Sequence, residues 1–479
     1  MAENPSLVHE EYEEMESRWH RARTVLAGED AVKACGEQYL PMLPTQDTTE
    51  YNSYRRRAQF VEATGRTASG LHGLLFLKEP DTTLPDKGEF EPLESDVDMR
   101  GSSIPDYAST VAEEVIAVGR AGTLVDWSDD EKRPAFRMYK AEEILNWRMT
   151  RFAGRMVLSE LALKERADED AKIEQIRVYE LTAGAVVCEI WQLLPKKGTS
   201  KSAGETEKEW RLVETRLPSR RSEFLNFIPF VFHSPTQRKD YCCAKPPLEA
   251  VITVNLHHYL VSADYNHALH YVACPTAWVA GFPEKSKLSI GSSVAWVSTN
   301  VNAKAGMLQV SGDLTAHVTA LEKDERYMAV LGARLLENQK KEAETAEALR
   351  LRQSGESSVL ASIALSLTSS LSQALQIAVW WFGSEVKPSD VEDTKIEINM
   401  DFSVERMAPD ELVALIGAWQ KLAISRDTLL YNLKKGEILP PKRTAEDEIE
   451  LIESGTDDIL KFSEESSRAA AAGKAPPAA

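Results

Sequence analysis

A long stretch without proline, residues 337–382, constrains this fold more than any other segment. Its first half is highly charged, whereas the half from Ser357 onward contains no charged side chain and many serines. Apolar residues recur at every fourth position of this second half, which places them on one ridge of a helix. We expect Gly355 to mark a bend between the halves, and the serine-rich faces to permit close neighbours. The ridge consists of Val359, Ile363, Leu367, Leu371, Leu375 and Val379.

The same charge-free run raises the question of a membrane span. A helix over residues 359–382 would be about 36 Å long, and a bilayer core is about 30 Å thick. However, its apolar side chains form a stripe rather than a collar, and its hydroxyl and amide side chains are too numerous for a helix that faces lipid. We therefore expect no membrane partner. Two interpretations stay open, a core helix of a large domain and a helix at a subunit interface, since both have this periodicity.

The composition bounds the size and the class of the protein. A chain of 479 residues, 43% of them hydrophobic, is long enough for about two to four structural units. Its net charge of −19 disfavours tight binding to nucleic acid through phosphate neutralisation, but it suits a surface past which nucleic acid slides. The five cysteines include no C-x-x-C pair and fit a reducing cytoplasm. We expect no secretory signal in the acidic start of the chain.

Hydrophobic periodicity predicts an α+β fold that is mostly α-helical. The period shifts toward two between residues 122 and 232, which indicates strands. Proline and acidic residues over 80–101 indicate a linker. A β-rich module over 275–310 falls between two long helices, as it would at the tip of a helical hairpin. The expected helical segments are 10–26, 49–77, 105–120, 248–273, 314–336, a helix that starts at Pro409, 425–435 and 443–453, and the expected strands are 123–127, 176–181, 186–194, 209–215, 228–232 and 394–402.

The sequence offers little evidence of catalysis. It contains no glycine-rich phosphate loop, no nucleophile elbow and no H-E-x-x-H motif. One predicted helix carries four histidines, and on it Asp264, His267 and His270 are spaced so that they could face one metal ion. Histidines that pair with carboxylates along a packed helix are the favoured interpretation. We therefore expect a protein that is not an enzyme, with no catalytic residue, no metal site and no cofactor.

Spaced aromatic and small residues follow a recognisable order along residues 15–440. In this order the chain resembles the portal proteins of tailed bacteriophages, in particular a podophage- and prophage-type family often left as a domain of unknown function. The residues that carry the resemblance are Trp19, Ala22, Arg23, Gly28 and Glu29; Tyr39, Leu40 and Pro41; Tyr54, Arg57, Ala58 and Phe60; Gly73, Phe76, Lys78 and Pro80; Ile228 to Val231; Leu248, Asn255, Tyr259, Ser262, Asp264 and Asn266; Ala277 to Gly281; Ser354 to Ser357; and Leu360, Ala374, Trp381 and Gly383.

The resemblance implies a portal-like architecture with wing, stem, clip and crown regions. It implies a dodecameric ring at one capsid vertex, through which DNA enters and leaves. The implied regions are N-terminal helices and an α/β wing at 1–240, a stem helix at 241–273, a clip at 274–312, a second stem helix at 313–337, a long wing helix with a tunnel loop and a strand at 338–405, crown helices at 406–460 and a disordered tail at 461–479.

The resemblance also implies roles for particular residues. The tunnel-loop candidates are Gln339, Lys340, Lys341, Arg350, Arg352 and Gly355; the helix-packing residues are Val359, Ile363, Leu367, Leu371 and Leu375; the stem residues are Asn255, Tyr259, Ser262, Asp264 and Asn266; and the clip residues are Trp278 and Trp296.

The implied partners are further copies of the chain, double-stranded DNA bound without sequence specificity, the terminase large subunit, a head–tail adaptor, and the major capsid and scaffolding proteins. The implied location is the virion, after assembly in the host cytoplasm. Two other interpretations stay open. One is a metal-dependent enzyme that uses the histidine-rich helix, and the other is a different oligomeric capsid or scaffold protein.

Overall fold

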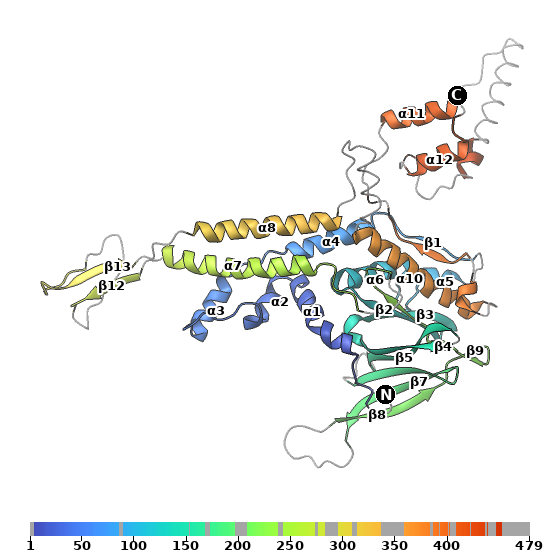
Figure 1. The fold of residues 1–479 in the computed structure, drawn as a ribbon, viewed down its shortest axis with the longest axis horizontal. Coiled ribbons are helices and arrows are strands. Elements are labelled where there is room, and N and C mark those ends of the chain that lie inside the picture. Colours follow the sequence, from blue (N-terminus) through green and yellow to red (C-terminus); the bar gives the residue numbers. More distant parts are fainter. Residues whose placement is uncertain are drawn as a thin grey trace, which may run out of the picture. The chain divides into compact units, whose positions relative to one another are not determined.

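The computed structural model describes residues 4–85, 90–152, 154–167, 173–196, 208–237, 243–273, 276–282, 296–308, 314–336, 359–383, 387–391, 393–400, 402, 409–421, 423–435, 438 and 447–452. The chain forms two compact units, Met1–Phe402 and Ser403–Ala479, and each is treated by itself. The predicted α+β class with predominant helices is confirmed (Figure 1).

The N-terminal helices pack on one long helix, α7 (Glu249–Ala273). The predicted helix over residues 10–26 is confirmed as α1 (Glu10–Leu26), and α2 (Glu29–Ala34) follows it. The predicted helical segment over 49–77 is interrupted at its centre, since α3 (Thr48–Arg57) and α4 (Ala63–Leu75) are separate helices. Side chains of α7 form hydrogen bonds with the backbone between them and so replace the bonds of a continuous helix.

Local sequence explains both ends of α6 (Ile104–Val118), which was predicted at 105–120. Ser103 and Asp106 form a reciprocal capping box at its start, where proline also favours helix initiation. The helix ends at Gly119, whose φ of 81° is left-handed. A β-carbon at this position would lie 2.8 Å from the carbonyl oxygen of Lys245, so only glycine fits.

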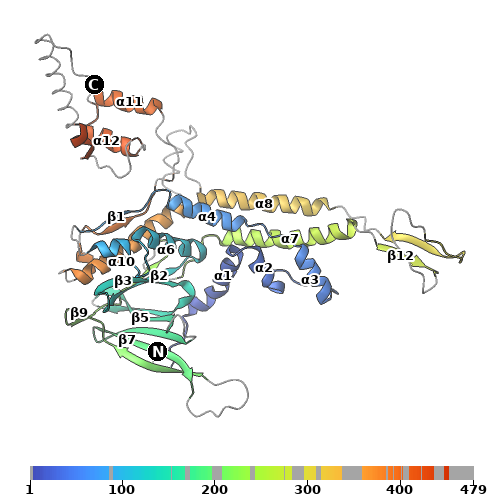
Figure 2. The ribbon, with the colours of Figure 1, turned by 180° about the vertical axis from the view of Figure 1, so that it is seen from behind.

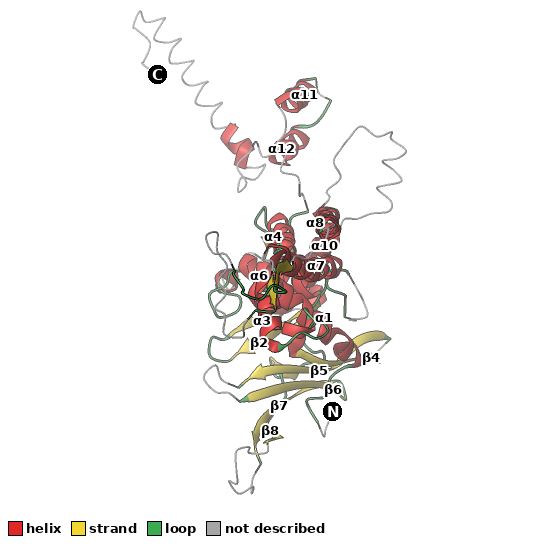
Figure 3. Cartoon of the chain, turned by 90° about the vertical axis from the view of Figure 1, so that its left-hand side faces the viewer, coloured by secondary structure: helices red, strands yellow, loops and turns green. Residues whose placement is uncertain are grey.

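Two antiparallel sheets form the β region, in the strand orders β11-β2-β3 and β4-β5-β6-β7-β8. Figure 3 shows the larger sheet on one side of the helices of the first unit. The five strands predicted here are present, whereas β3, β4 and β5 were not individually predicted because charged residues interrupt their alternation. The strands are β2 (Ala121–Ser128), β3 (Arg133–Lys140), β4 (Ile144–Phe152), β5 (Arg155–Arg166), β6 (Glu174–Thr182), β7 (Ala185–Pro195), β8 (Lys208–Arg216) and β11 (Phe230–His233).

The prediction of a plain linker over residues 80–101 is wrong. This segment contains a short strand, β1 (Asp81–Thr83), and a short helix, α5 (Glu91–Ser95). β1 pairs antiparallel with β14 (Lys395–Glu397), which is the ordered core of the strand predicted over 394–402. A partner so distant in the sequence supplies the hydrogen bonds that local propensity did not indicate.

The predicted apolar helix is α10 (Val359–Phe382), which packs on β11, β2 and β3 (Figure 2). Four of its five named packing residues, from Ile363 to Leu375, are fully buried within the chain, whereas Val359 is 39% exposed. Among the described residues, only α10 is long and apolar enough to cross a membrane, and 56% of its most apolar window is buried. Such a buried helix is equally typical of a protein core.

The polar side of α10 contacts backbone of the same chain. Ser372 accepts a hydrogen bond of 2.9 Å from the amide of Ile396, and Thr368 accepts one of 3.0 Å from the amide of Ile398. Ser362 donates to the carbonyl of Pro235 at 3.1 Å. The serine-rich face therefore permits close approach, as predicted, but at these three residues the neighbour is a segment of the same chain rather than another helix.

The carboxyl end of α10 lies among aromatic rings and arginines. Trp381 packs near Trp127, and Trp380 packs near Phe227. α10 has no basic residue in its last turn, but Arg220 and Arg221 donate hydrogen bonds to the carbonyls of Gly383 and Phe382. These two guanidinium groups stabilise the helix because they lie at the negative, carboxyl end of its dipole.

The second unit contains α11 (Pro409–Gln420) and α12 (Arg426–Lys435), both near their predicted positions. Leu429 and Leu430 are buried within it. Helical backbone over residues 447–452 falls inside the last helix predicted from the sequence.

Candidate functional site

Two long helices and a β-hairpin form the feature that the sequence singled out. α7 leads into β12 (Thr276–Ala280), β12 pairs antiparallel with β13 (Lys304–Leu308), and α8 (Thr315–Leu336) returns beside α7. The hairpin therefore lies at the tip of the helix pair, as predicted (Figure 1). We call α7, α8 and this hairpin the stem–clip projection.

Polar pairs hold α7 and α8 together. His257 Nδ1 lies 2.6 Å from Asp324 Oδ2, and His258 Nε2 lies 3.7 Å from Glu325 Oε1. Each pair joins one buried residue to one exposed residue, because Asp324 and His258 are buried. The partner on the other helix offsets the burial of Asp324, whereas Nδ1 of His258 is buried without a hydrogen-bond partner. The pairs set which faces of the two helices meet.

Asn255 of α7 anchors the start of α4. Its side-chain oxygen accepts hydrogen bonds from the amide and the hydroxyl of Thr64, at 3.2 and 2.8 Å, and its side-chain nitrogen donates to the carbonyl of Val61 at 2.8 Å. α4 has no side-chain cap of its own. Asn255 is fully buried and supplies this cap from a residue distant in sequence.

The other predicted stem residues continue this anchor along α7. Asp264 accepts a 2.6 Å hydrogen bond from the Tyr54 hydroxyl, and burial, reinforced by this carboxylate, raises the pKa of Tyr54. Ser262 accepts from the amide of Gln59 and from Asn266, both at 3.3 Å. The Tyr259 ring packs edge-on against Phe60. The structure thus brings all five stem residues together, four of them directly against the 54–64 segment.

The histidine-rich part of α7 has aromatic and polar neighbours. His267 packs edge-on between the rings of Tyr54 and Tyr271. Burial, together with the nearby charge of Arg57, lowers the pKa of His267. The described residues contain no group of three histidine, cysteine or carboxylate side chains that could hold a metal ion. The ligand set of Asp264, His267 and His270 is therefore not assembled, since Asp264 binds Tyr54 instead.

The predicted clip residues lie in the hairpin region. Trp278 on β12 faces Gly306 on β13, and a β-carbon at Gly306 would lie 2.9 Å from the indole nitrogen. Gly306 thus lets the ring lie across the hairpin, although Trp278 stays 44% exposed. Trp296, in the loop before β13, is partly buried. Two strands alone bury little apolar surface, so a hairpin of this kind gains stability when further chain packs on it.

α8 exposes apolar side chains along its outer side. Val318, Tyr327 and Val330 are 37–50% exposed, and few residues of this helix are buried, among them Asp324 and Met328. The inner side is occupied by α7 and α4. Tyr327 and Val330 are neighbours on this outer side, about 60° apart around the helix, whereas Val318 lies about 180° from Tyr327. The exposed apolar surface of the outer side therefore consists of Tyr327 and Val330, and Lys323 packs on the Tyr327 ring.

The remaining predicted site residues fall elsewhere. The tunnel-loop candidates, including Gln339, Arg350 and Gly355, lie outside the described residues. Four of the five packing residues of α10, Ile363, Leu367, Leu371 and Leu375, lie in the core of the first unit, and Val359 does not.

A buried polar chain was not found from the sequence. Ser370 donates to the carbonyl of Leu367, so it accepts from Nδ1 of His233; Nε2 of His233 then accepts from Thr123, which in turn accepts from Tyr107. These bonds, three of them 2.7–2.8 Å long, join α6, β2, β11 and α10. Burial lowers the pKa of His233 to about 3, so the ring is neutral. No spacing in the sequence relates these residues.

Comparisons with known proteins add a family match and remote structural likeness. A family model described as a domain of unknown function (DUF4055) matches residues 247–382, from the start of α7 to the end of α10. No curated protein matches the chain. Similar solved chains occur in the neck of an empty gene transfer agent (GTA) particle computed with C6 symmetry, in the virion of a native GTA particle, and in the neck of a native GTA particle computed with C12 symmetry.

Each of these three chains is 12% identical to this one. The TM-scores are 0.36, 0.37 and 0.38, with 80%, 83% and 84% of this chain and 91%, 96% and 98% of the other chain covered. Because the identities and TM-scores are low, no property of those chains is transferred to this one.

Proposed function

We propose that this chain is the portal protein of a tailed bacteriophage or a related phage-like particle. In this proposal, copies form a dodecameric ring at one capsid vertex, and DNA passes through the ring during packaging and ejection. The single observation that carries the proposal is the stem–clip projection, in which two long antiparallel helices present a β-hairpin at their tip.

The surface of the projection supports an assembly. α8 is fixed to α7 by His257–Asp324 and His258–Glu325, whereas Tyr327 and Val330, neighbours on its outer side, are exposed. Exposed apolar side chains that lie together mark a contact surface. A head-to-tail contact of this surface with the next copy closes into a ring when the rotation between copies divides a full turn.

The charge of the chain supports a conduit rather than a tight DNA-binding protein. A net charge of −19 offers no excess of cations to hold phosphates, so a DNA molecule inside the ring would slide without being trapped. The protein would contribute no catalysis. In this proposal the terminase large subunit drives packaging from outside the ring, a head–tail adaptor binds it later, and the major capsid and scaffolding proteins surround it in the virion.

The test is the native mass of the purified chain, measured by native mass spectrometry, with negative-stain images of the same sample. We expect closed rings with a central hole. Shells or filaments would instead support a different capsid or scaffold protein. A chain that stays monomeric at all concentrations, including with its scaffolding and capsid proteins, would contradict the proposal.

A further inference from the structure

A cavity of about 870 Å³, lined by both apolar and charged side chains, lies between the sheets β11-β2-β3 and β4-β5-β6-β7-β8, and nothing in the proposed portal function uses it. Its size falls in the range of ligand sites. One wall is a continuous run of β3, residues 135–140, and another is the end of β5, residues 164–166. The loop over residues 98–102 and the start of α6 complete it.

β3 presents an open edge to this cavity. It is the last strand of the order β11-β2-β3, so no strand in this sheet pairs with its outer side. Phe136 donates its amide to the carbonyl of Val97, and Lys140 donates its amide to Glu143, so both amides point away from β2. Met138 is two residues from each of them along the strand. Its amide and carbonyl therefore point away from β2, as the amides of Phe136 and Lys140 do. No hydrogen bond of these two Met138 groups occurs among the described residues.

The carboxylates around the cavity already have partners in the chain. Asp98 accepts from the backbone and hydroxyl of Ser102. Asp126 pairs with the buried Arg177 at 3.1 Å. Glu165 pairs with the same guanidinium at 3.0 Å and accepts from Tyr139. Asp126 and Glu165 thus share the charge of one guanidinium, and Asp98 is satisfied by hydrogen bonds.

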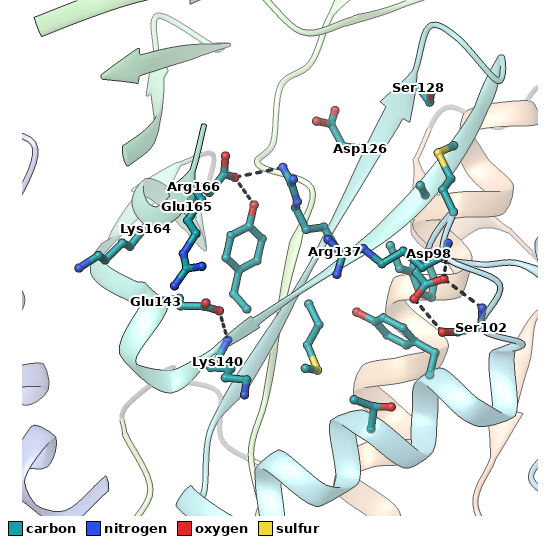
Figure 4. A pocket seen from close by; sticks show the side chains of 18 of the residues that line it. Asp98, Ser102, Asp126, Ser128, Arg137, Lys140, Glu143, Lys164, Glu165 and Arg166 are labelled. Atoms are coloured by element: carbon teal, nitrogen blue, oxygen red, sulfur yellow. Dashed lines mark hydrogen bonds and ion pairs between the residues drawn. The ribbon is translucent and has the colours of Figure 1, made fainter. Parts of the chain in front are cut away.

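The cations are arranged differently. Figure 4 shows Arg137, Lys164 and Arg166 near Glu165, and Lys140 beside Glu143. Arg137, Lys140 and Lys164 are each about half exposed, although Arg137 and Lys140 also pair, at 3.5 Å each, with the nearly buried Glu165 and Glu114. Lys164 and Glu174, 3.2 Å apart, are both about half exposed, and an ion pair of this kind contributes little. An incoming carboxylate can therefore replace Glu174 at Lys164 at small cost, and it can contact the exposed parts of Arg137 and Lys140 without displacing their buried partners.

We infer that this cavity binds an extended, acidic peptide segment of another protein chain. The segment adds to this edge of β3 at Met138, which supplies the backbone donor and acceptor, because the amides of Phe136 and Lys140 on either side are already bonded. Its carboxylates contact Arg137, Lys140 and Lys164. The inference does not depend on the portal proposal, since it concerns the cavity and not the ring.

The test uses the full chain and a pool of labelled decapeptides in which glutamate alternates with valine, isoleucine or threonine. Fluorescence anisotropy should show saturable binding, and hydrogen exchange of the Met138 amide should slow when the peptides are bound. The double variant Lys140→Glu/Lys164→Glu should bind at least about tenfold more weakly. Its matched control is Lys132→Glu, on the same β2–β3 hairpin but outside the cavity, which should bind as the wild type does.

A second set of peptides separates strand addition from charge attraction. Methylation of alternate backbone nitrogens removes the donors of one edge and keeps every carboxylate, so these peptides should fail to bind. Equal binding of methylated and unmethylated peptides would overturn the inference. So would an absence of saturable binding, or tighter binding of a single-stranded oligonucleotide at the same cations, which would indicate a phosphate site.

Discussion

α10 and α8 are helices of similar length, 24 and 22 residues, with opposite relations to the rest of the chain. α10 is enclosed: its ridge is buried from Ile363 onward, and Ser362, Thr368 and Ser372 form hydrogen bonds with backbone of the same chain. α8 is attached along one side only, and its outer side keeps apolar residues exposed. Most of the apolar surface of α10, the more apolar helix, is thus buried when the chain folds, whereas α8, the more polar helix, keeps exposed apolar side chains that another copy can contact.

This difference teaches that mean hydropathy does not locate an interface. An interface needs apolar side chains left over after the chain has folded, and only burial shows which these are. If the comparison is right, changes in α10 should act on folding and changes on the outer side of α8 should act on assembly.

The largest effect is expected from a charge in the core of α10. Ile363→Asp with Leu367→Asp would place two carboxylates at fully buried positions, which costs several kcal/mol each and exceeds typical domain stability. We expect no folded protein, as judged by soluble yield and circular dichroism. The matched control is Leu365→Asp on the same helix, where the side chain is 43% exposed. Equal loss in the control would show that any charge on α10 is harmful.

The next effect concerns the anchor on α7. Asn255→Ala removes three hydrogen bonds and leaves the buried amide of Thr64 without its acceptor, so the free energy of unfolding should fall by about 2–4 kcal/mol. Urea unfolding measures this. Asn266→Ala, which removes one longer bond on the same helix, is the control and should cost less than about 1 kcal/mol. Similar values for the two variants would mean that Asn255 does not cap α4.

A smaller effect depends on pH. His233 has a pKa of about 3 in the folded chain and 6.5 in its ordinary state, so the unfolded chain binds more protons between these values. The stability present above pH 6.5 is therefore lost as the pH falls toward 3. Between pH 7 and pH 4.5 this residue should account for about 2–3 kcal/mol.

The measurement is urea unfolding of the wild type and of His233→Gln at both pH values. At pH 7 the variant should have a lower free energy of unfolding than the wild type, because glutamine does not reproduce the hydrogen bonds of the imidazole ring. Between pH 7 and pH 4.5 this free energy should fall less in the variant than in the wild type. Parallel pH profiles for the two proteins would show that His233 does not titrate on unfolding.

The smallest effect on stability is expected on α8. Tyr327→Glu with Val330→Glu changes side chains that are 50% and 43% exposed, so the free energy of unfolding of a single chain should move by less than about 1 kcal/mol. Assembly should nevertheless be lost, as measured by native mass. Glu322→Gln with Arg326→Gln tests whether a charge change on the same helix alone disrupts assembly. Intact rings in the Tyr327/Val330 variant would place the contact elsewhere.

Much of the fold could be predicted from periodicity. The helix over residues 10–26, the long helices on either side of the β-hairpin and the apolar helix after Val359 were all indicated, because each carries its signal within a few turns. The strands β3, β4 and β5 were not individually indicated. Their arginines and glutamates are paired across strands, and a pairing partner cannot be read from one strand alone.

In the candidate site, too, the sequence indicated some residues but not the partners that they contact. Asn255, Ser262 and Asp264 stood out as polar residues on an otherwise apolar helix. Their partners, Thr64, Gln59 and Tyr54, could not be deduced, because contacts between residues so far apart depend on how the helices pack. The spacing of Asp264, His267 and His270 also fitted a metal site, and only the contact between Asp264 and Tyr54 argues for a structural role.

The sequence by itself determined most of the long helices and the strands with clear alternation, that the chain is acidic, and that a β-rich module lies between two long helices, because these properties depend on neighbouring residues. Tertiary structure decided which surfaces remain. It enclosed α10, left the outer side of α8 uncovered, and opened the edge of β3 beside four cations. The physical reason is that burial and hydrogen-bond satisfaction are properties of the packed chain, in which residues hundreds of positions apart compete for the same partners.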